Sequence, residues 1–452
     1  MEVQSLSKNK RIGLNFLSIL NDIKRRPEDA AEELGVTTEE INQIIAGEKE
    51  LSIEIINRAI EIWPVNKRDF FIFEDDCPDG VKTMSSIDSE KSARIMNRAG
   101  KPYYEYRDTA MSKVAPFRPE WILELCNVVD NDPENKIVQW NNGHFMHQFT
   151  YFIGDVNFYY KDENGKKQIA EMNTGDSMYI TPFVPHTFAT RNNSKSNGLI
   201  LALTYGGKLT GEPQQELSTM SNLGDKFALD FSSKNSASAS LLKYHREISS
   251  LSLKELSTRT NIPIEKLDNF EIGLVEPEIL DLEKIANALT VNIRDLLPND
   301  KIEDKVILKH HQDCKTWYYP ENIKCYKFHQ LASTTALPFS KSFEVELFNS
   351  ENSELDLVSG LHQYVYNIGQ NHIILNWEIS GQKHNQIINP NDSLYIKPFI
   401  KHNFRGVGKL LILRVGGKIS GDSQRELSTV GRENAKRAIS ETTLWFDKKG
   451  KN

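Results

Sequence analysis

The strongest constraint on the fold is an internal repeat. Residues 205–220 read YGGKLTGEPQQELSTM, and residues 415–430 read VGGKISGDSQRELSTV. Ahead of these segments, DSMYITPFVPHTF at 176–188 matches DSLYIKPFIKHNF at 392–404. The offset is about 210 to 216 residues, close to half of the 452-residue chain. A repeat of this period indicates two copies of one unit, and the small polar residues of 232–240 predict a linker between the copies.

Each copy begins with a helical part. Apolar residues of 27–47 recur at helical spacing, Gly35 sits at a turn, and Thr37 or Thr38 can cap the next helix. Segment 251–273 repeats this pattern, and both segments resemble helix-turn-helix units of the repressor type. The apolar stripes consist of Ala31, Leu34, Val36, Ile41 and Ile44 in the first copy and Leu253, Leu256, Ile262, Leu267 and Phe270 in the second.

The second part of each copy has the pattern of short strands. In 136–191, β-rich runs are separated by the turn sequences ENGK and NTGD. Several short strands at regular spacing favour an antiparallel barrel or jelly roll. We therefore predict an α+β fold of two tandem repeats, each a small helical domain followed by a β-barrel. The expected domains are 1–85 and 231–300 for the helices, and 86–230 and 301–452 for the barrels.

Composition restricts the environment and the partners of the chain. The net charge is −7, so no global charge attracts nucleic acid or an anionic membrane. No apolar run reaches the roughly 18 residues that span a bilayer, and the first residues lack the apolar region of a signal peptide. The four cysteines form no CxxC pair. A reduced, cytoplasmic protein without a membrane partner is expected.

The helix-turn-helix pattern raises the alternative of a transcription regulator that senses a small molecule. A recognition helix needs basic residues that face phosphates and base edges. The first candidate helix instead begins with Glu39 and Glu40, and the second, within 262–273, has one Lys against three acids. We therefore expect packing modules and no nucleic-acid partner. Specific binding of genomic fragments in a gel shift would revive the regulator.

Three potential metal ligands occur in the first barrel. His144 and Gln148 are four residues apart, and His186 follows 38 residues later. Together with Gly154, Gly175 and Pro182, these residues resemble the two motifs of the cupin family. Two departures stand out, because the first His of the usual HxH pair falls at Asn142 and the usual acid is Gln148.

The three candidate ligands can bind one ion only if the fold brings their side chains together. Positions four apart on a straight strand lie about 13 Å apart, so His144 and Gln148 can share an ion only if the strand bends between them. His147 has the opposite parity and should be a packed or surface residue. Two His and one further ligand leave open positions on an octahedral ion, as in non-haem Fe(II) oxygenases. A neutral Gln leaves the full charge on the metal, which suits an anionic substrate. The alternative is that Gln148 is only a polar barrel residue.

The second barrel provides an internal comparison. Gln363 and His402 align with Gln148 and His186, but the position of His144 is occupied by Ser359. One of three ligands is therefore missing. We predict that the second site is empty and that this barrel is structural.

Over nearly the whole chain, the sequence resembles the family of hydroxyethylphosphonate dioxygenases and methylphosphonate synthases, which have duplicated helix-turn-helix and cupin units with metal in the first cupin only. Asn141 and His144 match the family's substrate Asn and first iron-binding His. Arg98 and Tyr106 match its phosphonate-binding pair, and Lys24 matches by position a Lys that reaches the site. A phosphonate dianion needs several such donors.

The resemblance implies one Fe(II) per chain, with 2-hydroxyethylphosphonate and O2 as substrates. In the dioxygenases, which form hydroxymethylphosphonate and formate, a Glu ligand stands six residues before the last His; here that residue is Ile180. The synthases, which form methylphosphonate and CO2 or bicarbonate by cleaving the same carbon–carbon bond, use a Gln four residues after the first His, as Gln148 is here. Both features favour the synthase reaction.

Other expectations remain open. A cupin isomerase or epimerase could use the same barrel, although it would not call for this set of anion-binding residues. The chain could form a homo-oligomer, and Lys24 could then serve its own site or that of a neighbouring subunit.

Overall fold

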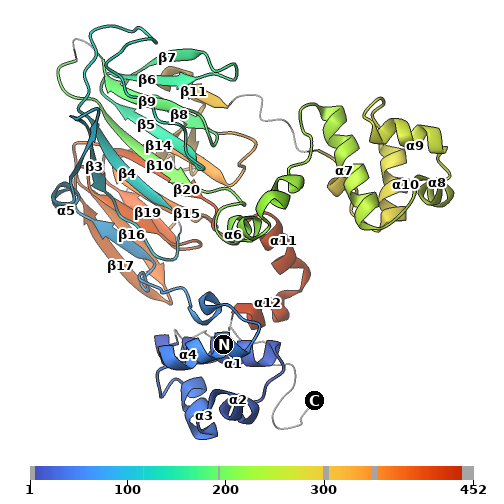
Figure 1. Cartoon of the computed structure of the whole chain (residues 1–452). Helices are drawn as coiled ribbons and strands as arrows, with labels where there is room; N and C mark the ends of the chain where they lie inside the picture. Colours follow the sequence, from blue (N-terminus) through green and yellow to red (C-terminus); the bar gives the residue numbers. More distant parts are fainter. Residues whose placement is uncertain (1–5, 116, 192–193, 299–304, 349–353, 440–452) are drawn as a thin grey trace.

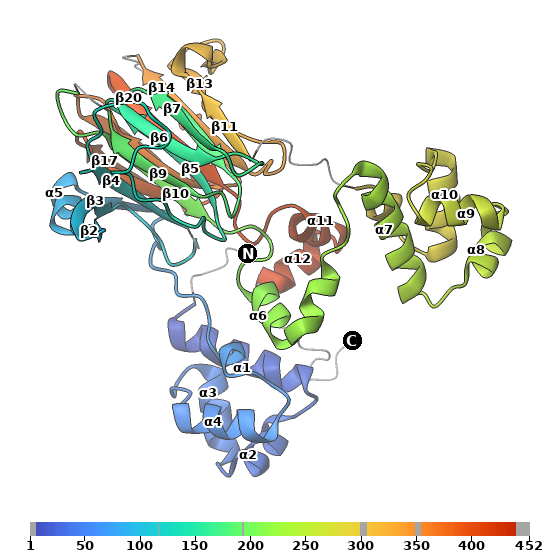
Figure 2. The ribbon, with the colours of Figure 1, turned by 45° about the horizontal axis from the view of Figure 1, so that its top comes forward.

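A computed structural model describes residues 6–115, 117–191, 194–298, 305–348 and 354–439. The strands form one β-rich body, and two groups of helices, α1–α4 and α7–α10, stand apart from it (Figures 1 and 2). Helices and antiparallel sheets are thus both present, as expected for an α+β protein. Within these ranges no helix has the length and apolar character needed to cross a membrane.

The first helical group follows the predicted pattern. It comprises α1 (Lys8–Asp22), α2 (Pro27–Leu34), α3 (Thr38–Ala46), α4 (Ile53–Ile62) and the 3-10 turn η1 (Lys67–Phe70). Gly35 ends α2 in the left-handed conformation at φ 69°, and the Thr37 side chain accepts a hydrogen bond from the backbone N–H of Glu40. The apolar stripe, including Leu34, Ile41 and Ile44, forms the core of this group.

The second helical group begins earlier than the sequence suggested. It comprises α7 (Lys234–Ile248), α8 (Leu253–Thr260), α9 (Ile264–Glu271), α10 (Ile279–Leu289) and η3 (Ile293–Leu296). The linker predicted at 232–240 is therefore wrong, because most of it forms the first turns of α7. Ser233 caps this helix by accepting from the N–H of Ser236, and Ala237 and Ala239 are buried. Small residues occur both in flexible linkers and in closely packed helices, and composition alone did not distinguish the two.

Two seven-stranded sheets have matching strand orders. The first has the order β11 (Val306–Lys309), β8 (Ser177–Ile180), β5 (His147–Ile153), β10 (Leu199–Tyr205), β4 (Arg118–Glu124), β3 (Lys101–Asp108), β2 (Arg94–Arg98). The second has the order β1 (Val81–Met84), β18 (Ser393–Ile396), β15 (His362–Asn367), β20 (Gly408–Val415), β14 (Ser340–Leu347), β13 (Tyr326–Gln330), β12 (Thr316–Tyr319). Each position of one sheet has a counterpart in the other.

A three-stranded sheet accompanies each large one. These are β7 (Lys167–Met172), β6 (Val156–Lys161), β9 (His186–Thr190) and β17 (Gln382–Ile388), β16 (Ile373–Ile379), β19 (Lys401–Arg405). The predicted turns at 163–166 and 173–176 join β6 to β7 and β7 to β8. The short elements α5 (Ser86–Lys91), α6 (Glu212–Thr219), η2 (Ser221–Phe227), η4 (His311–Asp313), α11 (Asp422–Thr429) and α12 (Arg432–Ile439) complete the described chain.

The two halves exchange edge strands. Strand β1 pairs with β18 of the second sheet, and β11 pairs with β8 of the first. Strand β1 precedes the expected domain border at 85/86, and the expected border at 300/301 lies outside the described residues. The domain borders therefore stay a prediction.

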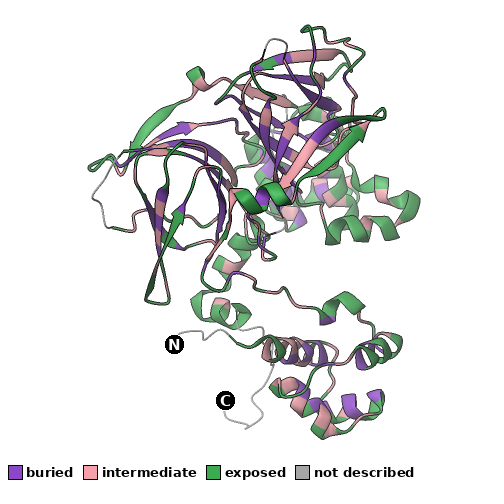
Figure 3. Ribbon diagram, turned by 90° about the vertical axis from the view of Figure 1, so that its left-hand side faces the viewer, coloured by how far each residue is buried: buried purple, intermediate pink, exposed green. Residues whose placement is uncertain are grey.

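Three apolar cores stabilise the β-rich body, and Figure 3 shows the buried segments of its strands. One core lies between the first large sheet and its three-stranded partner, and another lies in the same place in the second half. A third joins the two large sheets face to face, with Phe149 and Leu201 from one and Leu413 from the other. Each buried aromatic or aliphatic side chain contributes about 1.5–3 kcal/mol, so this third core holds the halves in one body.

Candidate metal centre

His144, Gln148 and His186 come together at one end of the first barrel. Strand β5 begins at His147, so Gln148 lies in the strand while His144 belongs to the preceding loop. The expected bend within a strand is therefore wrong, because the junction of loop and strand brings the two side chains together. Gly143 allows this path: its φ is +77°, and an added Cβ would lie 2.6 Å from the backbone of Phe183.

The two histidine rings are held in the same way: Nδ1 of each contacts a backbone carbonyl, which leaves Nε2 available. Nδ1 of His144 lies 3.0 Å from the Met146 carbonyl, and Nδ1 of His186 lies 2.8 Å from the Val184 carbonyl. A carbonyl only accepts, so each Nδ1 carries the hydrogen and each Nε2 keeps a lone pair. Such a contact orients histidine ligands in metal sites. Burial lowers the pKa of His186 to about 4, so its ring is neutral near pH 7.

Gln148 completes a set of three donors. Its amide nitrogen donates to Thr150 Oγ1 at 2.9 Å, and its Oε1 lies 3.0 Å from Nε2 of His144. Two lone pairs therefore face one another, and the ring centroids of His144 and His186 are 5.2 Å apart. A cation among these atoms would turn this repulsion into attraction. The three residues thus fit a mononuclear metal ion.

Asn141 aims a donor at this centre. Its Oδ1 accepts hydrogen bonds from the backbone N–H groups of His186 at 2.9 Å and Gly143 at 3.0 Å. The amide nitrogen is thereby directed at Nε2 of His186, 3.2 Å away. An anion bound at the metal would lie beside this N–H group.

Arg98 and Tyr106 lie on the neighbouring strands β2 and β3. The Arg98 guanidinium donates to the Gln139 carbonyl at 2.7 Å and lies 3.4 Å from Oγ1 of Thr187, the residue after His186. The register pairs Tyr106 with Arg94, and the Arg98 guanidinium lies 4.7 Å from the ring centroid of Tyr104. Burial raises the pKa of Tyr106 to about 12, and the charge of Arg98 opposes this shift. Tyr106 therefore keeps its proton and can donate it in a hydrogen bond.

Within one chain, Lys24 does not lie with Asn141, Arg98 and Tyr106. It follows the end of α1 with φ 61°, and its ammonium donates to the carbonyls of Asn21 at 3.3 Å and Asp22 at 3.1 Å. The helical group that carries it stands apart from the strands in both views (Figures 1 and 2).

Ile180 lies directly across from Gln148. The register of β5 and β8 pairs these two residues, and the side chain of Ile180 is fully buried. Cβ atoms of facing residues in antiparallel strands are about 4.5–5.5 Å apart. A carboxylate at position 180 would therefore reach toward the space that the Gln148 oxygen faces.

Sequence reasoning missed two buried polar residues of the first barrel. Thr150 fixes the amide of Gln148, and its place two residues along the same strand was the available signal. Glu124 is fully buried, and neither of its oxygens has a hydrogen-bond partner in the described structure. Burial raises the pKa of Glu124 well above its usual value, against the effect of Arg98. No local pattern marked this buried acid.

His147 points to the other face of β5, as expected from its parity. Its ring stacks between Tyr179 and Tyr205, at centroid distances of 6.0 and 5.8 Å. Burial lowers the pKa of His147 to about 4. It is a packed residue between the two large sheets.

A second group with metal-binding side chains lies between the halves. His311, His329 and Glu344 have ligand atoms within 4.8 Å of one another. The Glu344 oxygens already accept from Tyr151 at 2.6 Å and Lys409 at 3.0 Å. A cation here would compete with the Lys409 ammonium, so the group containing His144 is the better candidate.

No family model matches the chain. Among solved structures, the chain is similar to Streptomyces albus HEPD with 2-hydroxyethylphosphonate and Fe(II) bound, with a TM-score of 0.88 and 33% identity over 97% of this chain and 99% of that one. A PhpD structure with cadmium, complexed with hydroethylphosphonate, shares the fold, with a TM-score of 0.75 and 18% identity over 95% of this chain and 99% of that one.

The fold is thus that of the hydroxyethylphosphonate dioxygenases. Methylphosphonate synthase of Nitrosopumilus maritimus (strain SCM1) is 63% identical over 443 residues, which cover 98% of this chain and 97% of the relative. The chain belongs to the methylphosphonate synthase family, as its resemblance predicted.

Proposed function

We propose that the chain is an Fe(II)-dependent oxygenase that converts 2-hydroxyethylphosphonate and O2 into methylphosphonate and CO2 or bicarbonate. The single observation that carries this choice of reaction is the pairing of Gln148 with Ile180 on adjacent strands. The similar synthase from Nitrosopumilus maritimus and the HEPD that holds Fe(II) and 2-hydroxyethylphosphonate support it.

The metal would be held by three atoms: Nε2 of His144, Nε2 of His186 and Oε1 of Gln148. All three are neutral donors, so the site keeps the whole dipositive charge, which a phosphonate dianion complements. When bound, Fe(II) supplies the activation of O2 for cleavage of the carbon–carbon bond. The four electrons that O2 takes up come from the substrate, so the reaction needs no second organic reductant.

The side chains around this centre would bind and orient the substrate. The Asn141 amide, whose oxygen is fixed by two backbone N–H groups, would donate to a phosphonate oxygen. Arg98 and Tyr106 supply a guanidinium and a protonated hydroxyl from the adjoining strands. Directed donors that need no rearrangement are the main means by which a protein stabilises developing negative charge.

Ile180 would decide which product forms. A carboxylate at this position, as in the dioxygenases, adds a negative charge and a proton acceptor beside the metal. Ile180 offers neither and excludes water from that side because it is fully buried. Gln148 then serves as the third ligand from the neighbouring strand.

Lys24 would complete the site from a second copy of the chain. The distance between its helical group and the strands of the same chain in Figure 1 supports this assignment. A homo-oligomer is therefore part of the proposal.

The matching orders of the two large sheets support two tandem helix-turn-helix and cupin units. The four free cysteines agree with a cytoplasmic location.

The regulator remains a weaker alternative. Glu39 is exposed on α3, and Glu40 pairs with Lys49 at 2.7 Å. This surface provides no cationic face for a phosphate backbone.

Anaerobic reconstitution with Fe(II), followed by 2-hydroxyethylphosphonate and O2, tests the proposal. Phosphorus NMR is expected to show methylphosphonate as the product. Hydroxymethylphosphonate with formate would assign the dioxygenase reaction instead. An absence of turnover with one iron bound per chain would rule out both reactions.

A further inference from the structure

The second barrel carries an additional cation in the row of facing residues that contains the candidate Gln ligand of the first barrel. In the first barrel, facing residues on adjacent strands form the row Arg118, Thr204, Gln148 and Ile180. The corresponding row of the second barrel is Lys341, Arg414, Gln363 and Ile396. Only Thr204 is replaced by a charged residue, and its replacement Arg414 lies directly beside Lys341.

Arg414 has no anionic partner in the described part of the chain. Its Nε donates to Oε1 of Gln363 at 2.8 Å, and its guanidinium lies 5.5 Å from the ring centroid of Phe343. Burial lowers the pKa of Arg414, which reflects the cost of a charge with little water around it. The acids on the same strand as Lys341 pair with other lysines, Glu344 with Lys409 and Glu346 with Lys327. The described residues therefore provide no ion pair for Lys341. Like charges that face each other across strands are destabilising unless something compensates them.

Two buried polar atoms nearby are also unpartnered among the described residues. They are Nε2 of Gln363 and Nε2 of His402, and both side chains are fully buried. Nδ1 of His402 lies 2.9 Å from the Ile400 carbonyl, so Nε2 keeps a lone pair. Buried polar groups almost always have partners, and these two lie in the region that corresponds to the metal centre.

A purely structural role explains only part of this arrangement. The Arg414 guanidinium replaces the charge that a metal would bring to the Gln363 oxygen. This role does not account for the two unpartnered nitrogens, and it leaves Arg414 beside Lys341, a position that Arg118 occupies in the first barrel opposite the neutral Thr204. A bound anion accounts for all of them, because it would accept from Arg414, Lys341 and the Gln363 amide.

We propose that the second barrel binds a small oxyanion of the phosphate and phosphonate class between Arg414, Lys341 and Gln363. The monoanion is favoured, because its P–OH group donates to the lone pair of His402. The barrel predicted to be only structural thus gains a binding site that does not depend on iron.

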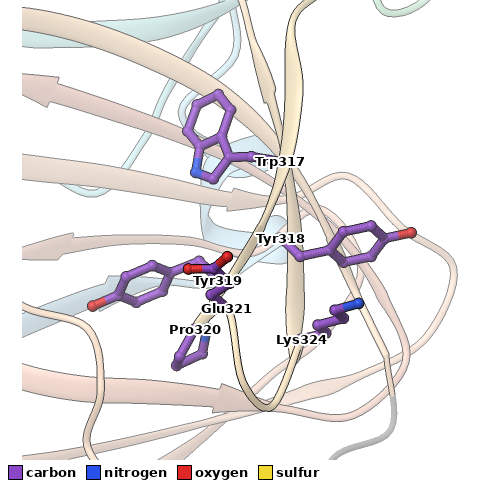
Figure 4. A pocket seen from close by; sticks show the side chains of 6 residues that line it. All are labelled: Trp317, Tyr318, Tyr319, Pro320, Glu321 and Lys324. Atoms are coloured by element: carbon purple, nitrogen blue, oxygen red, sulfur yellow. The ribbon is translucent and has the colours of Figure 1, made fainter.

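An aromatic pocket adjoins this row. It is lined by Trp317, Tyr318, Tyr319, Pro320, Glu321 and Lys324, and Figure 4 shows these side chains around the end of β12. The Trp317 ring lies 5.8 Å from Phe343, the ring beside the Arg414 guanidinium. Phe343 therefore separates the oxyanion site from this open surface.

Calorimetric titration of the full-length, metal-free chain tests the proposal. The Arg98→Gln background removes the phosphonate-binding Arg of the first barrel, and inorganic phosphate is the probe. One phosphate site per chain is expected, and a further Arg414→Gln substitution should weaken it at least tenfold. Lys341→Gln should weaken it severalfold and provides the test if Arg414→Gln does not fold. Arg405→Gln, which removes the same charge from an exposed position on β19, should leave it unchanged.

Two further probes sharpen the result. Sulfate, which carries no proton near neutral pH, should bind several times more weakly than phosphate. Tighter binding of methylphosphonate than of phosphate would identify the reaction product as the ligand, and the reverse order would identify the free phosphate ion. The proposal is overturned if the Arg98→Gln chain binds no phosphate, or if Arg414→Gln stays within twofold of it. Equal weakening by Arg405→Gln would also overturn it.

Discussion

The paired substitutions Gln148→Ala and Gln363→Ala should have opposite effects. Gln148→Ala removes one of the three proposed ligand atoms, and we expect Fe(II) affinity to fall on the order of 100-fold, equal to about 2.8 kcal/mol. The metal-free protein should change less. It loses the neutral hydrogen bond to Thr150, worth about 1 kcal/mol, but also the repulsion between the Gln148 oxygen and the His144 lone pair.

Gln363→Ala should act on folding. It removes the acceptor of the Arg414 Nε–H group, and a hydrogen bond to a charged group contributes about 1.5–3 kcal/mol to the free energy of unfolding. Fe(II) affinity should be unchanged, because the second barrel has Ser359 in place of the first His.

Anaerobic Fe(II) titration by calorimetry measures the first effect, and denaturant unfolding of the metal-free chains measures the second. The unsubstituted chain should bind one iron. An equal loss of iron affinity in both variants would refute the reasoning, since it would give the second barrel a metal. Unchanged iron affinity in Gln148→Ala would reduce the centre to two histidines.

Four further outcomes follow from the same geometry. Ile180→Glu should shift the product from methylphosphonate toward hydroxymethylphosphonate and formate, measured by phosphorus NMR; an unchanged product ratio would contradict the role of Ile180. Thr150→Val should lower Fe(II) affinity about tenfold because the Gln148 amide loses its partner, while Thr150→Ser should retain it. Asn141→Asp should raise KM for 2-hydroxyethylphosphonate at least tenfold, since a carboxylate would face an anion; an unchanged KM would remove Asn141 from the binding site. The metal-free protein should lose stability as the pH falls from about 6.5 toward 4, because four buried histidines have folded pKa values of about 4 and the unfolded chain binds more protons in this window; thermal unfolding measures the slope, which should be smaller in His147→Phe.

Much of the candidate metal centre could be predicted because its signals are local. His144 and Gln148 are neighbours in sequence, and the repeat aligned His186 with His402. Gly35 and Thr37 marked the helix ends for the same reason: a left-handed turn and a cap depend on a few adjacent residues. Spacing could not show that His144 precedes the strand, and the assumed bend was wrong.

The remaining features depend on registers between distant strands. Arg414 and Gln363 meet only because β20 lies beside β15, and no pattern within either strand indicates this contact. The polar composition of 232–240 predicted a linker. In the structure most of this segment is helical, and the side chains of Ala237 and Ala239 are buried. Tertiary packing decided both cases.

The exchange of β1 and β11 constrains how the chain can fold during synthesis. The edge of β8, which carries Ile180, stays uncovered until Val306 has left the ribosome, and β1 waits still longer for β18. Uncovered edges invite pairing with other chains, so a nascent first half should depend on chaperones. The wall of the catalytic barrel therefore closes only when translation is well into the second half, and a truncated product that ends before β11 would carry all three proposed iron ligands in an unfinished barrel.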